Sequence, residues 1–190
     1  MEYLPLRAVL RQATNDVHAR LHHHDGFSAI QSATIELDGY RTLLLRLYGF
    51  YVPFERAVGL GRDRTQWLED DLGSVGLDLR GITVPMCANI PRLDNAGRRL
   101  GANYVVEGSA LGGRGLAHDL DRLLGTGVTK GRRFFLGRGS GTAGAWHSYL
   151  EQLAEAPLEP AARTEIIAAA TETFAVFEEW LNGWKTTPHG

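Results

Sequence analysis

The sequence has little cysteine and no long apolar run. Cys87 is the only cysteine in 190 residues, which excludes an internal disulfide framework and a cysteine-rich zinc site. No run of about 18 apolar residues occurs, so the sequence predicts no membrane-spanning helix. The N-terminal segment carries charges where a secretory signal needs an apolar centre. We therefore expect a protein of the reducing cytoplasm.

An excess of positive charge is also missing. Lys and Arg together number 20 and Asp and Glu 22, which gives a formal net charge of -2 at pH 7. Without a basic excess, bulk electrostatics does not hold nucleic acid or an anionic membrane, and neither is expected as a partner. The remaining composition, 44% hydrophobic and 22% charged, is that of a globular protein. At this length we expect a single domain over residues 1–190.

The pattern of apolar residues predicts an all-α fold. Apolar positions recur at spacings of three and four, and no segment alternates with period two for more than a few residues. Pro53 lies inside one predicted helix and is expected to kink or break it. The stretch 73–91, rich in glycine and proline, is expected to form a structured loop. Predicted helices cover residues 6–21, a short segment after Gly26, 39–58, 62–72, 94–124, 144–154 and 160–184.

His18 is the histidine with the most informative position. Arg11, Thr14 and His18 share one face of the first predicted helix. A neutral imidazole there could ligate iron, with Arg11 directed at an anionic group of the same ligand. The alternative is a histidine with a purely structural role. The consecutive histidines at 22–24 point about 100° apart on a helix and cannot converge on one metal, so we interpret them as a solvated helix end.

Glycine is abundant, and several glycines share one face of the helix predicted over residues 94–124. The chain has 23 glycines, about 12% against a usual value of roughly 7%. Gly101, Gly108, Gly112 and Gly115 follow one another at spacings of seven, four and three, and Gly113 adds another. An interior glycine costs up to about 1 kcal/mol relative to alanine, so a bare backbone must serve some purpose. Close helix packing and contact with a flat ligand explain it equally well.

Two motifs of the sequence are similar to those of a known family. The segment LRQATNDVH, residues 10–18, is similar to the pattern L-[RK]-x-A-T-x-x-x-H, and YVVEGSALGG, residues 104–113, resembles a distal-helix glycine motif. Together they make the chain resemble the bacterial, biliverdin-producing heme oxygenases of the phytochrome-linked type. The resemblance implies a single-domain multi-helix fold that holds heme between the first helix and a kinked, glycine-rich distal helix.

The resemblance also implies roles for individual residues. His18 would be the axial ligand of the heme iron, and the distal helix would contribute Gly108, Ser109 and Gly112 to catalysis. Many family members carry Asp where this chain has Ser109. Such a distal side offers bound oxygen little beyond backbone and water, whereas a distal His or Arg would favour cleavage of the O–O bond. The other heme-binding candidates are Arg11, Tyr104, Arg138 and His147.

The implied activity is the cleavage of heme by O₂ and external electrons to biliverdin, CO and ferrous iron. No flavin or nicotinamide site is visible, so a ferredoxin or flavoprotein reductase would supply electrons, and a bacteriophytochrome could accept the biliverdin. The donor would dock on a basic surface, for which the candidates are Arg20, Arg132, Arg133 and Arg138. Because Ser109 stands where many family members have Asp, an alternative function is a non-catalytic heme carrier or sensor on the same fold. A helical module that binds no heme is a third possibility.

Overall fold

The computed structural model describes residues 5–156 and 159–183, and the regular secondary structure in these ranges is helical, without β-strands. Trp184, the expected end of the last helix, lies outside the described residues. No described helix is both long and apolar enough to cross a membrane. The helices are α1 (Leu6–His22), α2 (Asp25–Gln31), α3 (Leu37–Val58), α4 (Asp63–Ser74), α5 (Ala96–Asp119), α6 (Asp121–Leu124), α7 (Arg133–Leu136), α8 (Thr142–Ala154) and α9 (Pro160–Leu181), with one 3₁₀ turn, η1 (Gly139–Gly141).

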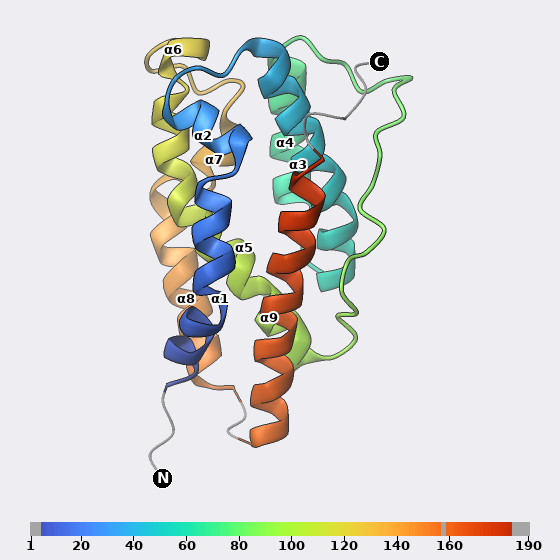
Figure 1. Ribbon diagram of the computed structural model, residues 1–190, viewed down its shortest axis with the longest axis vertical. Helices are drawn as coiled ribbons and strands as arrows, with labels where there is room; N and C mark the ends of the chain where they lie inside the picture. Colours follow the sequence, from blue (N-terminus) through green and yellow to red (C-terminus); the bar gives the residue numbers. More distant parts are fainter. Residues whose placement is uncertain (1–4, 157–158, 184–190) are drawn as a thin grey trace.

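The long helices run along the long axis of the molecule (Figure 1), and α9 packs against α1, α3 and α5. Helix α5 packs extensively on α9 and also on α7 and α8, while α1 packs on α9 and α8. Helices α1 and α5 make few direct contacts with each other, although they share both neighbours. The lower part of α5 runs obliquely and its upper part closer to vertical, so its axis changes direction. A space between α1 and α5 is therefore framed by their common neighbours.

The close packing of α5 on α9 depends on Gly101. Gly101 is buried, and a Cβ at this position would lie 2.0 Å from the carbonyl oxygen of Ile166 on α9. The opposite surface of α9 is correspondingly small, because Ala169 and Ala170 are fully buried there. One glycine of the predicted face is thus explained by helix packing.

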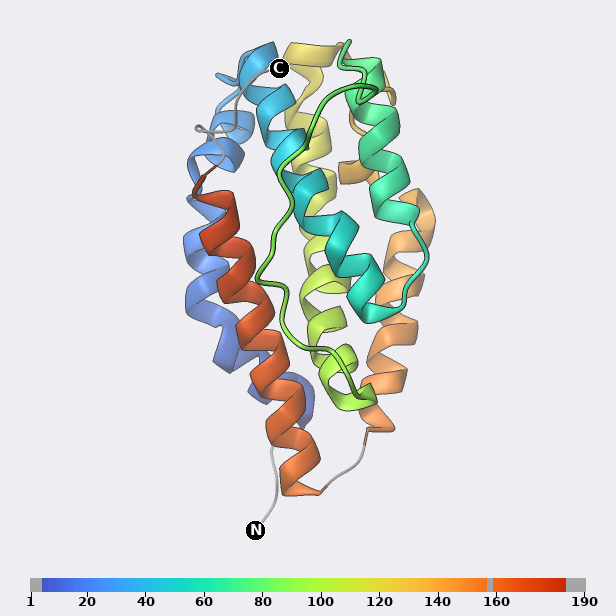
Figure 2. The same ribbon diagram turned by 90° about the vertical axis from the view of Figure 1, so that its right-hand side faces the viewer.

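Helix α3 continues through Pro53, so the expected break is wrong, and a kink at this position stays a prediction. Proline has no N–H and leaves the carbonyl four residues earlier without its helical partner. That carbonyl belongs to Gly49, and it accepts a hydrogen bond from the backbone N–H of Cys87 at 2.9 Å. A Cβ on Gly49 would lie 2.3 Å from the carbonyl oxygen of Pro85. The segment 75–95, which runs between α3 and α9 (Figure 2), is therefore docked at this point of α3.

The helix predicted over residues 94–124 divides in two, because α5 ends at Asp119 and α6 follows. The cause is the buried side chain of Arg132, which is only 3% exposed. Its guanidinium donates to the carbonyl oxygens of Ala117 at 2.5 Å and Gly125 at 2.8 Å. These carbonyls lie where a helix ends and its last oxygens need donors. A distant arginine thus fixes the end of α5.

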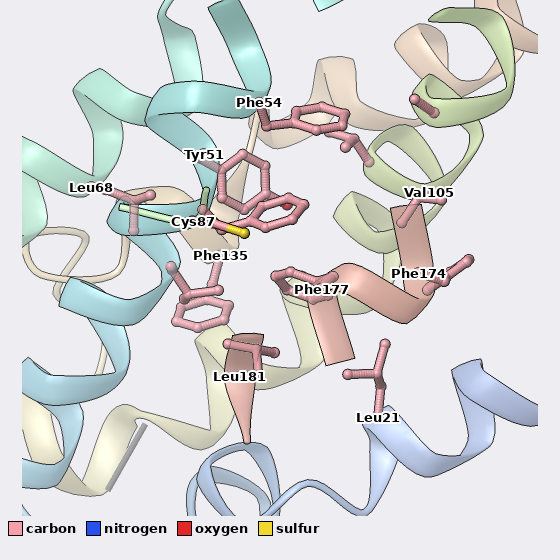
Figure 3. Packing of buried hydrophobic residues seen from close by; sticks show 14 of the residues in the cluster. Leu21, Tyr51, Phe54, Leu68, Cys87, Val105, Phe135, Phe174, Phe177 and Leu181 are labelled. Carbon is pink, nitrogen blue, oxygen red and sulfur yellow. The ribbon is translucent and has the colours of Figure 1, made fainter. Parts of the chain in front are cut away.

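An aromatic cluster joins α3 to α9. The ring of Phe50 stacks on Phe54 with centroids 5.4 Å apart and meets Phe177 of α9 edge-on at 4.8 Å. Tyr51 lies 5.1 Å from Phe134, and Figure 3 shows the rings of Tyr51 and Phe177 gathered between the helices. Offset and edge-on pairs of this kind contribute roughly 0.5–1.5 kcal/mol beyond their buried area. This cluster forms the closed side of the space between α1 and α5.

We predict that Gly101→Ala destabilises the protein by about 1–3 kcal/mol, because the added methyl group forces α5 away from α9. Gly115→Ala on the same helix is the control, because a Cβ there meets nothing within 4 Å. It should raise stability by up to about 1 kcal/mol through helix propensity. Urea unfolding followed by circular dichroism measures both. Equal stability of the two variants would contradict the packing argument.

Candidate functional site

The space between α1 and α5 is a cavity with an open mouth. Its volume is about 210 Å³, below the roughly 300–1000 Å³ usual for small-molecule sites. One wall is formed by α1 and the facing wall by the second half of α5. The remaining walls are mainly apolar and come from α3, α4, α7 and α9, which contribute Leu47, Tyr51, Trp67, Phe134, Phe174 and Phe177.

The α1 wall presents the imidazole of His18. Val17 is buried on the packed side of α1, and His18 and Leu21 line the cavity. Neither ring nitrogen of His18 has a hydrogen-bond partner among the described residues. Burial first, and the neighbouring His22 second, lower the pKa of His18. The ring is therefore held in the neutral form, which is the form that ligates metals.

His22 adds a second imidazole to the same wall. It lies one turn after His18 and lines the cavity, and the two ring centroids are 4.6 Å apart in an edge-on arrangement. His24 is buried, accepts a hydrogen bond from Gly26 N–H at Nδ1, and places Nε2 3.0 Å from the carbonyl oxygen of Leu181. The interpretation of residues 22–24 as a solvated helix end is therefore wrong for His24, which the tertiary fold buries, whereas His22 and His23 are exposed.

The α5 wall presents backbone. Gly108, Ser109 and Gly112 line the cavity, and a Cβ on Gly112 would meet nothing within 4 Å. Gly113 differs, because its Cβ would lie 2.8 Å from the carbonyl oxygen of Phe135. The hydroxyl of Ser109 donates to the carbonyl oxygen of Val105 at 2.6 Å. The predicted glycine face therefore serves both purposes: Gly101 and Gly113 permit close packing, and Gly112 leaves bare backbone facing the cavity.

The structure does not bring the other predicted heme-binding residues to this cavity. Tyr104 packs beside Trp146 with centroids 5.8 Å apart and interacts with the Thr14 hydroxyl, so it closes the corner between α1, α5 and α8. Arg11 lines a separate surface depression on α1. His147 points away because Trp146, its neighbour on α8, packs against Gly108, and it lies 3.5 Å from Glu151.

Arg138 and the other predicted docking arginines are engaged within the protein. Arg138 lies 3.2 Å from Glu107, and Arg20 forms a bidentate pair with Glu178 at 2.6 and 2.8 Å. Arg132 is buried, as described above, and Arg133 lies over the Trp67 ring at 4.7 Å. Residues adjacent in sequence thus point in different directions. Burial removes Arg132 from the expected docking surface, whereas Arg20 and Arg138 are exposed, so a surface that includes them stays a prediction.

Arg64 lines the cavity, although nothing in the sequence indicated a role for it. It is only 5% exposed and donates to Glu107 at 2.7 Å. Its backbone N–H donates to Glu55, as do the N–H and hydroxyl of Thr65. These residues lie on three different helices, so no local spacing relates them. The cavity is therefore not free of charged side chains.

Comparison with known proteins assigns the chain to a family. The sequence model of the heme oxygenases matches residues 4–183. The chain belongs to the heme oxygenase family. No curated protein matches it in sequence.

Solved heme oxygenases share the fold at low identity. The enzyme from Leptospira interrogans superposes with a TM-score of 0.76 at 17% identity, over 94% of this chain and 99% of that one. Heme oxygenase-1 from the cyanobacterium Synechocystis, solved with heme, gives 0.72 at 18% over 96% and 93%. Heme oxygenase-2 from the same organism, solved with heme and NO, gives 0.77 at 21% over 96% and 86%. At such identities the likeness establishes the fold.

In this heme oxygenase, Asp71 positions one wall of the cavity. Its carboxylate accepts hydrogen bonds from the backbone N–H groups of Arg133 at 2.7 Å and Phe134 at 2.8 Å, at the start of α7. Asp71 is fully buried. Burial raises its pKa to about 6, although both backbone hydrogen bonds oppose the rise. The carboxylate thus holds Phe134 and Phe135 in place beside the cavity.

We predict that Asp71 makes the stability of the apoprotein fall as pH rises between about 4 and 6. The unfolded carboxyl loses its proton near pH 3.8 and the folded one near pH 6, so in this window the folded state binds more protons. The effect is on the order of 3 kcal/mol. Asp71→Asn removes the titration, so the unfolding free energy of wild type minus that of the variant should fall as pH rises across the window. Parallel pH profiles in urea unfolding would contradict the assignment.

Proposed function

We propose that this protein degrades heme, using O₂ and external electrons to release biliverdin, CO and ferrous iron. The observation that carries the proposal is the arrangement of His18 across one cavity from the bare backbone of α5. A flat macrocycle can enter such a slot with an imidazole on one face and glycine on the other. The protein's own aromatic groups border the slot and leave it open.

The residues present fit heme. His18 would ligate the iron through a neutral imidazole that has no competing hydrogen bond. Gly108 and Gly112 would let the α5 backbone approach the opposite face. The apolar walls suit the porphyrin and exclude water. For the heme carboxylates we retain Arg11 as the candidate, because it lies on the same helix as His18 and its guanidinium has no ion-pair partner among the described residues.

Heme would supply both the iron that activates O₂ and the carbon that is oxidised. The residues of the chain that line the cavity would disfavour competing, peroxidase-like reactions of the heme. The α5 wall offers no acidic or basic side chain at Gly108 or Gly112 to protonate bound oxygen. The Ser109 hydroxyl donates its hydrogen bond to the carbonyl oxygen of Val105. Toward a ligand in the cavity this hydroxyl can therefore only accept a hydrogen bond. These features favour oxidation of the macrocycle over peroxidase-like chemistry.

The partners belong to the same proposal. Electrons would come from a ferredoxin or flavoprotein reductase in the cytoplasm, and a bacteriophytochrome would accept biliverdin if the protein is of the phytochrome-linked type.

The Ser109 hydrogen bond also favours a second candidate, a heme carrier or sensor, because the position lacks the carboxylate found in many relatives. Incubating the heme complex with a reductant in air separates the two. Replacement of the Soret band by a biliverdin spectrum supports the enzyme, and an unchanged spectrum supports the carrier.

We predict that His18→Ala folds but loses the axial ligand. Its Soret band with hemin should shift, and turnover should fall by more than about tenfold, because an imidazole no longer fixes the iron. Hemin titration and biliverdin release measure the two effects, and circular dichroism confirms folding. His23→Ala is the matched control, because this exposed histidine does not line the cavity. Native turnover in His18→Ala would remove the ligand assignment.

We predict opposite effects of Gly112→Leu on stability and on heme binding. The apoprotein should gain up to about 1 kcal/mol, because leucine favours helix and the added Cβ meets no atom within 4 Å. Heme affinity should fall by about tenfold or more, because the side chain occupies the slot. Gly112→Ala should have a smaller effect on affinity. Unchanged hemin affinity in Gly112→Leu would show that the macrocycle does not contact this wall.

A further inference from the structure

His22 lines the cavity but takes no part in the proposed function. It ends the last turn of α1, four residues after His18, so both side chains project from one face of the helix. Neither imidazole has a hydrogen-bond partner among the residues that the structure describes. His23 differs, because it is exposed and does not line the cavity. Two unused imidazoles thus border the same cavity.

The two rings are close enough to share one metal ion. The ring centroids of His18 and His22 are 4.6 Å apart, and the ring planes lie at 76° to each other. Two imidazoles that ligate one ion through bonds of about 2.1 Å have ring centres roughly 5 Å apart, so little movement is required. Two histidines four residues apart on one helix face are also the pair by which H-E-x-x-H helices bind zinc.

Neighbouring residues hold this part of α1 in place. Phe174 of α9 is buried and meets the ring of His18 edge-on, with centroids 6.3 Å apart. His24, just beyond α1, is buried and places Nε2 3.0 Å from the carbonyl oxygen of Leu181. This contact ties the end of α1, and with it the last turn that carries His22, to the end of α9. A pair held in this way loses less conformational entropy when it binds an ion.

The charges that line the cavity tolerate a cation. Asp119 ends α5, is half-buried, and has no ion-pair partner in the part of the chain that the structure describes. Its negative charge favours a cation in the cavity. The positive charge of Arg64 is paired with Glu107 at 2.7 Å. Among the described residues no group of three or more His, Cys, Asp or Glu could hold a metal, so a site here has two protein ligands.

We propose that His18 and His22 form a two-histidine site for a divalent transition-metal ion in the protein without heme. Imidazole nitrogen suits Zn²⁺, Ni²⁺ and Cu²⁺, and water would complete the coordination of the ion. The site goes beyond the proposed function, because it needs no heme. An ion held by His18 occupies the side chain that would ligate the heme iron. The ion and heme therefore exclude each other, and a bound ion acts as an inhibitor of heme binding.

The first experiment is a calorimetric titration of the heme-free protein with Ni²⁺ at neutral pH. His18→Ala and His22→Ala should each weaken Ni²⁺ binding by about tenfold or more, because one of the two protein ligands is lost. Both histidines are exposed, so both variants should fold, which circular dichroism checks. His23→Ala is the matched control and should bind Ni²⁺ within about twofold of wild type, because its side chain points about 100° away. His147→Ala, whose ring lies 3.5 Å from Glu151, controls for a surface site.

The second experiment titrates hemin into the protein at several fixed concentrations of Ni²⁺. Ni²⁺ should weaken the apparent hemin affinity of the wild-type protein in proportion to its occupancy. The same concentrations should have little effect on hemin binding by His22→Ala, which lacks one ligand of the ion.

The outcomes separate this inference from the proposed function. If hemin produces no Soret shift in the wild-type protein, the proposed function fails, while the Ni²⁺ titration of the heme-free protein still tests the histidine pair. If His18→Ala or His22→Ala binds Ni²⁺ as tightly as wild type, the two rings do not share an ion, and the inference is overturned. It is also overturned if saturating Ni²⁺ leaves the hemin affinity of wild type unchanged, because the ion would then lie elsewhere.

Discussion

The separation of α1 from α5 is the constraint on which the rest of the structure depends. Both helices pack on α8 and α9, yet they make few contacts with each other. The separation is maintained because α5 meets α9 backbone to backbone at Gly101, which fixes one end of α5, while Arg132 fixes the other. Between these anchored ends α5 is free to present backbone to a cavity. The slot exists because its walls are held by neighbours and not by each other.

Glycine in α5 contributes in two ways that have the same physical origin. A residue without a Cβ allows another chain or a ligand to approach the helix axis. At Gly101 and Gly113 the approaching group is a protein carbonyl. At Gly112 no protein atom approaches, so the bare backbone remains available. The helix-forming propensity lost at each glycine is therefore offset by packing at some positions and by binding at others.

Charged groups around the cavity are few and individually held. Asp71 accepts two backbone N–H groups at the start of α7, and Glu55 does the same at the start of α4. Both carboxylates occupy helix N-termini, where backbone donors and the helix dipole favour negative charge. Arg64 is the exception, since only part of its hydrogen-bonding capacity is used.

The sequence by itself determined the helical class, most helix ranges, and the positions of His18 and the glycine face, because these depend on residue type and local spacing. The resemblance built on those motifs is confirmed for the heme oxygenase family as a whole, while the phytochrome-linked type stays a proposal. Tertiary structure alone decided which glycines pack and which stay open, that α3 continues through Pro53, and that Arg132 lies buried. It also decided that Arg138 pairs with Glu107 and that Arg64 reaches the cavity. Each of these outcomes depends on atoms brought together from distant helices, and a pattern of three- and four-residue spacings carries no information about such contacts.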